Sequence, residues 1–386
     1  MKRIFFVIVL LLFSALVLIS CREQENSKED KEYQQEELVE KEQIEEPKVE
    51  EKEITLSAIG DILLHKRVFD DAKTETGYDF TPFFEKIKPY LNDTTITMAN
   101  QETMIGGTKI GLSDYPSFNS PQEIGDTLKQ VGVDVVTIAN NHTLDRGEKA
   151  IQSAIDHWKA IDMVYTGAYQ SREDSKRIRV VETDEGIDVA FLSYTYGTNG
   201  IPVPEGKEYL VNLIEKEKIA TDVKEAEKIS DAIVLSYHFG TENQRMPNPE
   251  QVDLAQYAAD LGVDVVIGHH PHVLQPVDWL RGEKGNKTFV IYSLANFISG
   301  QDEFYNRIGG VVKVTIKKTI KEEEETITVE QPKFLPTYME YKPKFKDFKV
   351  IPMKDLNNDI MPGYQKYYEE IKAHMSQWMP ELEFME

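Results

Sequence analysis

Short apolar runs alternate with stretches of helical periodicity from Ile54 onward. Runs such as EITLSAIG, TTITMAN and TFVIYSLAN have the length of buried strands, and the segments between them repeat apolar residues every three or four positions. Strands that alternate with helical patterns of about 10–15 residues are typical of an α/β domain with a largely buried sheet. The pattern therefore predicts one such domain over residues 54–318.

The hydrophobic pattern changes after residue 318. The stretch KKTIKEEEETITV has two alternating arms about a charged turn, which predicts a β-hairpin. The stretch from Pro362 to Met385 predicts a closing helix with aromatic residues on one face. We expect residues 319–386 to form a C-terminal extension packed on the domain.

The first 21 residues, MKRIFFVIVLLLFSALVLISC, have the organisation of an export signal, with Lys2 and Arg3 before an apolar run. The end of this segment resembles a bacterial lipobox, in which the cysteine is lipidated and becomes the mature N-terminus. Cys21 is the only cysteine of the chain. The alternative is an uncleaved transmembrane anchor, because the run is near the short limit for crossing a bilayer. Both interpretations place the remainder at the extracellular face of the bacterial cytoplasmic membrane, and the first anchors it there by lipid.

Residues 22–53 are rich in glutamate and have no hydrophobic period, which predicts a disordered acidic tether. The whole chain has a formal net charge of −23, and the domain stays acidic without the tether. Nucleic-acid binding needs a net basic face, so the charge argues against nucleic acid as a partner. A polyanionic substrate would need a metal ion or a local basic cleft to reverse the field.

Two segments of the domain share one plan. Residues 120–147, SPQEIGDTLKQVGVDVVTIANNHTLDRG, and residues 248–275, NPEQVDLAQYAADLGVDVVIGHHPHVLQ, each place a proline at a helix start and the word GVDVV before a histidine-bearing loop. The shared word alone is common, since a glycine helix stop before a valine-rich strand recurs in α/β proteins. The polar residues that follow both strands are the informative part.

Other predicted strands also end in carboxylate, carboxamide or imidazole groups. Six of the eight histidines lie in short motifs at the ends of predicted strands. Because the carboxyl ends of strands form the ligand crevice of open α/β sheets, we expect these groups to meet in one place. The residues are Asp61 and His65, Asn100 and Glu102, Asn141 and His142, His238, the histidines of GHHPH, and Asn296.

This mixture of donors suits a divalent metal such as Mn²⁺, Zn²⁺ or Fe²⁺, whereas oxygen ligands alone would suggest Ca²⁺ or Mg²⁺. There are more candidate ligands than one tetrahedral ion can use. Two ions about 3.5–4 Å apart would account for the surplus.

The ordered words GDILLH, ANQET, ANNHTLDRG, SYTYGTNG, YHFGTE, GHHPHVLQ and YSLANF closely resemble the CapA/PgsA family of poly-γ-glutamate capsule biosynthesis proteins. That family is similar in fold to the calcineurin-like metallophosphoesterases, and the resemblance covers residues 54–300. It implies a four-layer α/β/β/α sandwich with a two-metal site at the strand ends.

Carried over word by word, the resemblance implies roles for individual residues. His142 would act as an acid or stabilise the transition state, and Asp61 and Glu102 would serve catalysis through the metal, with Glu102 where a bridging aspartate is usual. The implied metal ligands are Asp61, Glu102, Asn141, His238, His270 and His272.

The sequence departs from the phosphoesterase pattern at two places. The histidine of an Asp-x-His word is replaced by Leu63, with His65 two positions late, and the usual glycine before Asn-His is Asn140. These changes leave metal binding plausible and put phosphoester hydrolysis in doubt.

The histidine tract itself admits two interpretations. In an extended segment His270 and His272 point the same way and His269 the opposite way, which favours the pair as ligands. A direct match of Gly268-His269 to a Gly-His motif favours His269 as the ligand instead. We otherwise expect His65 and His269 to orient the ligands.

Four further residues are candidate substrate ligands, although each has a structural alternative. The guanidinium of Arg146 could bind an anion or pair with Asp145. The aromatic and amide groups of YTYGTNG could line the cleft or pack under a glycine-rich turn. The candidates are Arg146, Tyr196, Asn199 and Asn296.

Three functions are consistent with these features. The first is a metal-dependent member of the capsule machinery that acts outside the membrane on poly-γ-glutamate, beside the capsule synthase subunits, with hydrolase-type chemistry if it is an enzyme. The second is a non-enzymatic binding or export subunit of that machinery. The third is an extracellular metal-dependent phosphoesterase or nucleotidase.

Overall fold

The computed structural model describes residues 49–322 and 324–386. The chain forms two compact units, residues 1–50 with 321–324 and residues 51–320 with 325–386. In the first unit the described residues are the ends of strands β1, β12 and β13. The predicted export signal, Cys21 and the tether up to residue 48 lie outside the described residues.

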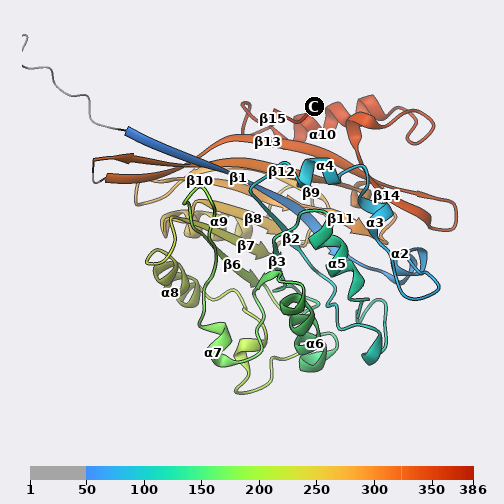
Figure 1. Ribbon diagram of the computed structural model, residues 1–386. Coiled ribbons are helices and arrows are strands. Elements are labelled where there is room, and N and C mark those ends of the chain that lie inside the picture. The colour runs from blue at the N-terminus through green and yellow to red at the C-terminus, as the bar shows by residue number, and fades with distance from the viewer. Residues whose placement is uncertain (1–48, 323) are drawn as a thin grey trace, which may run out of the picture. The chain divides into compact units, whose positions relative to one another are not determined.

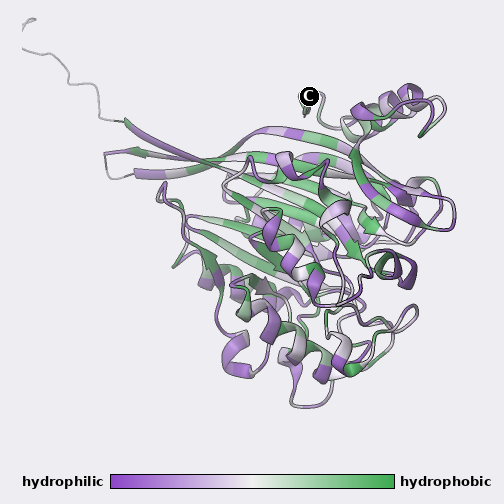
Figure 2. Ribbon diagram, turned by 45° about the vertical axis from the view of Figure 1, so that its right-hand side comes forward, coloured by the Kyte–Doolittle hydropathy of each residue, from purple (hydrophilic) through white to green (hydrophobic). Residues whose placement is uncertain are grey.

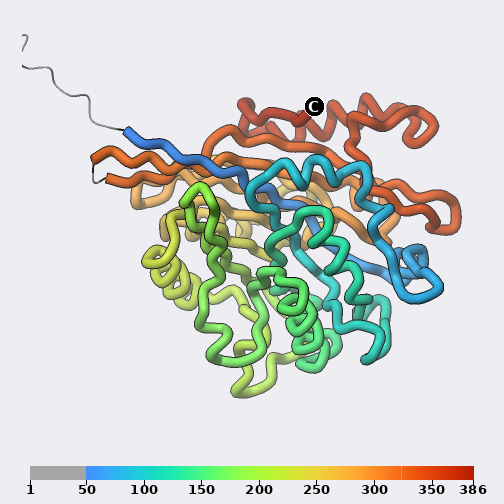
Figure 3. The backbone as a smooth tube through the Cα atoms, viewed as in Figure 1, coloured from blue at the N-terminus to red at the C-terminus, as the bar shows by residue number. Residues whose placement is uncertain are grey.

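The larger sheet of the second unit has nine strands within the described residues (Figure 1). Their order is β14-β13-β12-β1-β2-β3-β4, with β11 beside β1 and β15 beside β13. β1 at the start of the unit therefore lies next to β12 near its end, as the blue and orange tubes show (Figure 3). The bounds are β1 Val49–Leu63, β2 Ile96–Asn100, β3 Val135–Thr137, β4 Val164–Thr166, β11 Asn296–Ser299, β12 Ile308–Lys321, β13 Glu324–Lys342, β14 Lys346–Pro352 and β15 Glu383–Phe384.

The smaller sheet has six strands in the order β5-β6-β7-β8-β10-β9. β6, β7, β8 and β10 are parallel, and β5 and β9 run antiparallel at the edges. Parallel neighbours need long crossovers, which helices supply in both sheets. The bounds are β5 Arg179–Val181, β6 Val189–Thr195, β7 Ala232–His238, β8 Val265–His269, β9 Leu274–Arg281 and β10 Lys287–Leu294.

Helices cover the outer face of each sheet. Those on the nine-stranded sheet are α2 Lys66–Asp71, α3 Thr81–Phe84, α4 Lys88–Leu91, α5 Glu123–Gln130 and α6 Gly147–Ala160. Those on the six-stranded sheet are α8 Lys216–Ala226 and α9 Pro249–Asp260. The remaining helices are α7 Arg172–Ser175, α10 Tyr364–Met375 and the 3₁₀ turns η1 Thr108–Ile110, η2 Glu208–Leu210, η3 Tyr305–Arg307 and η4 Met353–Asp355.

Strand alternation divides the buried side chains into three clusters. Along β1, Ala58 faces the core between the two sheets while Ile59 faces the helices. Along β6, Phe191 enters the same inter-sheet core while Leu192 packs under α8 and α9. Figure 2 shows apolar colouring on the strands and more hydrophilic colouring on the outer helices. The predicted four-layer α/β/β/α sandwich is confirmed.

The repeated word GVDVV has one copy in each sheet. Its aspartate lies just before the strand in both copies and accepts a hydrogen bond from the first part of the neighbouring strand. Asp134 Oδ2 accepts from Thr97 N at 2.9 Å, and Asp264 Oδ2 accepts from Ile233 N at 2.8 Å. The second helix start is also as predicted, since Asn248 and Gln251 form a capping box with Pro249 in the first turn of α9.

A strand of the nine-stranded sheet runs across each predicted boundary of the domain. β1 begins at Val49, five residues before the predicted start and inside the predicted tether, and residues 49–53 are mostly exposed. The predicted extension begins inside β12, and the strands β12, β13 and β14 belong to the nine-stranded sheet. The predicted closing helix is α10, whose Ile371 and Met375 join the core between the sheets. Along residues 49–322 and 324–386, no helix combines the length and apolar character needed to cross a membrane.

Candidate metal centre

Strand ends from both sheets deliver polar side chains to one place, as the sequence predicts. Asp61 of β1 is in register with Asn100 of β2, and His238 of β7 is in register with His269 of β8. Two glycines permit the close backbone approach that this convergence needs. A Cβ at Gly60 would overlap the carbonyl oxygen of Ala295, and one at Gly268 would overlap that of Tyr292.

Asp61 is a fully buried carboxylate surrounded by hydrogen-bond donors. Its Oδ1 accepts from Asn100 Nδ2 at 2.8 Å and lies 3.0 Å from His269 Nδ1. Its Oδ2 accepts from the backbone N–H of His270 at 3.3 Å and lies 3.5 Å from His272 Nδ1. Burial opposes ionisation, but the hydrogen bonds from His269 and His272 outweigh it and hold the pKa of Asp61 well below its usual range. Asp61 is therefore an ionised ligand candidate.

Glu102 is equally buried, but neither of its carboxylate oxygens has a hydrogen-bond partner among the described residues. Its Oε1 lies 3.8 Å from both His238 Nε2 and His272 Nε2. Burial raises the pKa of Glu102 well above its usual range. A buried carboxylate without a partner is costly, and a cation between Glu102 and these imidazoles would remove the cost. The donor set therefore fits a divalent metal ion.

The imidazoles of His238 and His270 are buried in their neutral form. Burial lowers the pKa of His238 well below its usual range and the pKa of His270 to about 3. His238 Nε2 lies 3.0 Å from Asn141 Oδ1. His270 Nδ1 is buried and makes no hydrogen bond within the described ranges, and the same is true of His269 Nε2. Both nitrogens of His238 thus have amide partners, since its Nδ1 lies 3.4 Å from Asn100 Nδ2, whereas His270 is neutral with a free nitrogen and is ready to bind a metal.

His272 differs from these two because it faces the carboxylates. Burial lowers its pKa, but the negative charges of Glu102 and Asp61 outweigh that effect and raise the pKa to about 9. Its Nδ1 lies 3.1 Å from Asn296 Oδ1, which leaves Nε2 directed to Glu102. A proton on His272 or Glu102, or a divalent cation between them, relieves the same burial cost.

The conformation of the histidine tract differs from the extended segment that the sequence predicts. β8 ends at His269, and His270 and His272 have positive φ angles of 99° and 58°. The alternation of side chains therefore stops at the strand end. As a result His269 and His272 both approach Asp61, and His270 packs against Tyr196 at 4.6 Å between ring centroids.

Two groups of donors lie close enough to hold an ion. In one, ligand atoms of Asp61, Glu102 and His272 lie within 4.8 Å of one another; in the other, those of Glu242, His270 and His272 do. Glu242 was not among the residues predicted from the sequence, although it lies in the word YHFGTE four residues after His238. An acidic residue in a loop after a buried strand does not by itself indicate a metal ligand.

The loop after β3 holds His142 beside the centre. His142 Nδ1 lies 2.8 Å from Asp145 Oδ2, which also accepts from Phe118 N at 2.8 Å. The ring of His142 packs edge-on against Phe118 at 4.7 Å. Asp145 therefore orients His142, a role that the sequence spacing of three residues could have suggested.

The unusual Asn140 has a structural explanation. Its side chain donates to Gln101 O at 3.0 Å and accepts from His142 N at 3.0 Å. It thereby ties the loop after β2 to the loop after β3, next to both Glu102 and His142. A glycine could not make this connection.

The remaining predicted residues take different positions. Tyr196 and Asn199 lie beside the centre, where Asn199 Oδ1 accepts from Asn141 Nδ2 at 3.3 Å. Asn296 contacts His272 and donates to Asn306 O at 2.9 Å. His65 receives a hydrogen bond from Gly300 N at 3.1 Å, packs on Phe118, and has its pKa lowered by burial to about 4.

Arg146 is engaged elsewhere. Its guanidinium donates to Gly111 O and Ile110 O at 3.1 Å each and to Ser113 Oγ at 2.6 Å, instead of to Asp145. Arg146 thus fastens residues 110–113, and a substrate anion would have to compete with these acceptors.

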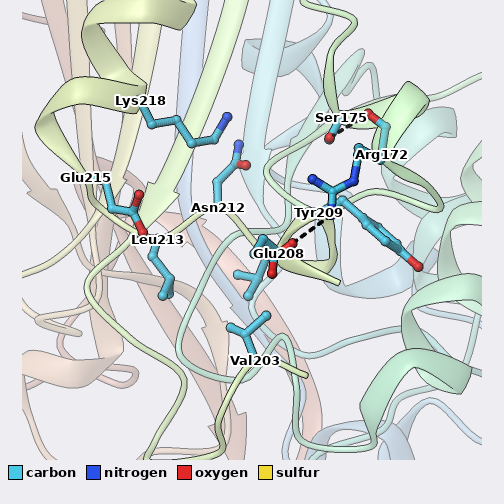
Figure 4. Close-up of a pocket in the computed structure, with 10 residues that line it drawn as sticks. Arg172, Ser175, Val203, Glu208, Tyr209, Asn212, Leu213, Glu215 and Lys218 are labelled. Carbon is cyan, nitrogen blue, oxygen red and sulfur yellow. Dashed lines mark hydrogen bonds and ion pairs between the residues drawn. The ribbon is translucent and has the colours of Figure 1, made fainter. Parts of the chain in front are cut away.

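A separate cavity of about 250 Å³ lies between α7, η2 and the start of α8 (Figure 4). Arg172 on its wall is paired with Glu208 at 3.1 Å. Asn212 and Lys218 also line it. The described residues that line this cavity include none of the predicted site residues, so the chemistry is better sought at the strand ends.

A two-sheet α/β sandwich with a buried histidine and carboxylate centre at its strand ends is the class of protein that the fold and the site define. The chain belongs to the family of bacterial capsule synthesis proteins (PGA_cap), whose model matches residues 55–301. The family that the sequence resembles is thereby confirmed.

Two relatives carry related descriptions. The capsule biosynthesis protein CapA of Bacillus anthracis is 29% identical over 270 residues, which cover 65% of this chain and 61% of that protein. The PGA biosynthesis protein CapA of Bacillus subtilis (strain 168) is 26% identical over 277 residues, which cover 69% and 68%. The match to the first relative thus spans less than two thirds of its length.

Among solved structures, the calcineurin-like phosphoesterase YfkN from Bacillus subtilis is similar with a TM-score of 0.43 and 14% identity, covering 83% of this chain and 98% of that chain. The sulfate thiohydrolase SoxB of Thermus thermophilus is similar with a TM-score of 0.36 and 14% identity, covering 71% and 43%.

Proposed function

We propose that the protein is a metal-dependent member of the capsule machinery, held at the extracellular face of the cytoplasmic membrane by its lipidated N-terminus, and that it acts on poly-γ-glutamate beside the synthase subunits. The observation that carries the metal-dependent part is Glu102, whose buried carboxylate has imidazole nitrogens around it and no other partner in the described chain. The family match over residues 55–301 supports the assignment to capsule synthesis. The export signal and Cys21 support the location.

The centre would hold two ions, with Mn²⁺, Zn²⁺ or Fe²⁺ as candidates for this donor set. Asp61 and His272 would hold one, and Asn141, His238 and His270 the other. Glu102, whose two carboxylate oxygens have no hydrogen-bond partner among the described residues, would serve as a further ligand. When bound, such ions polarise a carbonyl or phosphoryl oxygen and lower the pKa of water.

The residues of the chain supply the rest of the chemistry. Asp145 holds His142 through Nδ1, which leaves Nε2 to accept a proton from a nucleophile and then pass that proton to a leaving group. The exposed ring of Tyr196, at 46% relative exposure, and the amide of Asn199 line the approach to the centre. The phenol and amide groups can orient an acidic polymer without adding negative charge to an acidic body.

A non-enzymatic role as a binding or export subunit is the second candidate. The observation that favours it is Leu63, which is buried in the core where phosphoesterases place a metal-binding histidine. A metal centre with one ligand fewer could serve structure alone. An extracellular phosphoesterase is a third candidate, and we expect it to fail a screen of generic phosphoesters with added Mn²⁺ for the same reason.

A complementation experiment separates the first two functions. The host gene is deleted and replaced by the full chain carrying His270→Ala and His272→Ala, and polymer at the cell surface is measured. His157→Ala, which lies on α6 away from the centre, is the matched control. We expect loss of polymer with the double variant and normal polymer with the control, at equal protein levels. Normal polymer with the double variant would exclude a catalytic metal centre and leave the export role.

A further inference from the structure

The loop of residues 239–247, which follows β7, carries an acidic side chain over the metal centre. A carboxylate oxygen of Glu242 lies within 4.8 Å of ring nitrogens of both His270 and His272. Glu242 is exposed, whereas these histidines and the carboxylates of Asp61 and Glu102 are buried. It therefore approaches the centre from the solvent side, opposite to the strands.

The second observation that points to a ligand here is His270. This side chain is only 4% exposed, and its Nδ1 has no hydrogen-bond partner among the described residues. A buried imidazole nitrogen of this kind is rare unless it binds something. The nearby carboxylate does not serve as its hydrogen-bond partner, so the space between them suits a cation.

The loop is held in place by contacts with the segment that carries the histidines. Asn243 N donates to Pro271 O at 2.8 Å, and Gln275 Nε2 donates to Gln244 O at 2.8 Å. Asn306 Nδ2 donates to Asn243 Oδ1 at 2.8 Å. These contacts hold the loop, and with it Glu242, against the segment that carries the histidines. A glutamate that only contacts solvent would not need such support.

The C-terminal helix α10 supports the same loop. Arg245 Nη1 donates to Glu370 Oε1 at 2.6 Å, and its guanidinium lies 4.1 Å from the ring centroid of Tyr305. The hydroxyl of Tyr305 also donates to Glu370, at 3.2 Å from each carboxylate oxygen. The helix therefore positions the loop and, through it, Glu242.

We propose that Glu242 is a metal ligand of this centre and binds the ion that His270 holds. The inference rests on the proposed metal centre and adds to it an anionic ligand from outside the strand ends. The other donors near His270 are the imidazoles of His238 and His272, which carry no negative charge. Glu242 would therefore supply a negative charge at this position, where the other nearby carboxylate is Glu102.

The test is a titration of the metal-free full-length protein in detergent with Mn²⁺ and, separately, Zn²⁺, followed by calorimetry and by elemental analysis after dialysis. The variants are Glu242→Gln, His270→Ala and the double variant, and the matched control is Glu250→Gln, an exposed residue of α9. Loss of groups that merely orient ligands costs about 10–100-fold in metal affinity, so loss of a ligand should cost at least about tenfold.

We expect Glu242→Gln to weaken one bound equivalent at least about tenfold and to leave the other unchanged. The double variant should lose that same single equivalent, while Glu250→Gln matches the wild type. If Glu242→Gln binds both metals like the wild type, Glu242 is not a ligand, although the metal centre stands. If the wild type binds neither metal, the centre and this inference fail together. An unchanged melting temperature of metal-free Glu242→Gln confirms that folding is intact.

Discussion

The unpartnered carboxylate of Glu102 gives a quantitative test of the centre. In Glu102→Gln the charge is removed while the size of the side chain is kept. A buried polar group without a partner costs about 1–3 kcal/mol, and more when it is charged. The amide is still a buried polar group, but it cannot ionise, so the metal-free variant should be more stable than the metal-free wild type by up to about that amount.

The expected temperature shifts follow from the size of the protein. An unfolding entropy of about 2.1 cal/mol/K per residue gives about 0.7 kcal/mol/K for a body of this length. The metal-free variant should thus melt up to about 4 °C above the metal-free wild type. One ion at a hundred times its Kd stabilises the wild type by about 2.7 kcal/mol, or about 4 °C. If the variant binds about a hundredfold more weakly, less than about 1 °C of that shift remains.

Differential scanning calorimetry measures the melting temperatures of the wild type and of Glu102→Gln, each with EDTA and with Mn²⁺. Glu250→Gln, which removes an exposed carboxylate, should keep the full shift with metal. The reasoning is refuted if Glu102→Gln gains as much from Mn²⁺ as the wild type does, because a metal ligand cannot be lost without cost.

Three further predictions concern the scaffold. Burial raises the pKa of Asp264 to about 7, above its unfolded value near 3.9. The stability of the protein should therefore fall as pH rises from about 4 to 7, by on the order of 4 kcal/mol. In urea melts Asp264→Asn should remove this pH dependence and match the wild type only near pH 4. Glu370→Gln should speed amide exchange at Asn243 and Gln244, since it weakens the ion pair with Arg245, and unchanged exchange would contradict the support by α10. Gly268→Ala should cost about 1–3 kcal/mol or more, because its Cβ meets the backbone of Tyr292, and an unchanged urea midpoint would be evidence against that contact.

The layered fold and the place of the site were predictable from local signals. The hydrophobic period, the asparagine and proline at the start of α9, and the glycine that begins GVDVV are all short-range features. They placed Asp61, Glu102 and His238 at strand ends. The carboxyl ends of parallel strands then meet by geometry alone.

The details of the loops could not be predicted in the same way. The positive φ angles of His270 and His272 depend on contacts with other segments, so the expected alternation failed. The donors of Arg146 bind the backbone of residues 110–113, which lie more than thirty positions away in sequence. Glu242 is an exposed acidic residue among many, and only the folded loop brings it to the histidines.

The two sheets meet at the centre, and this has a mechanical consequence. Asp61 and Glu102 lie at or just after strands of the nine-stranded sheet, whereas His238, His270 and His272 lie at or just after strands of the six-stranded sheet. An ion shared by these donors would act as a cross-link between segments that are far apart in the chain, such as those that carry Asp61 and His272. A chain with a single cysteine has no internal disulfide to make such a tie. Removal of such an ion by a chelator should then loosen the rim of the sandwich where its two sheets are joined.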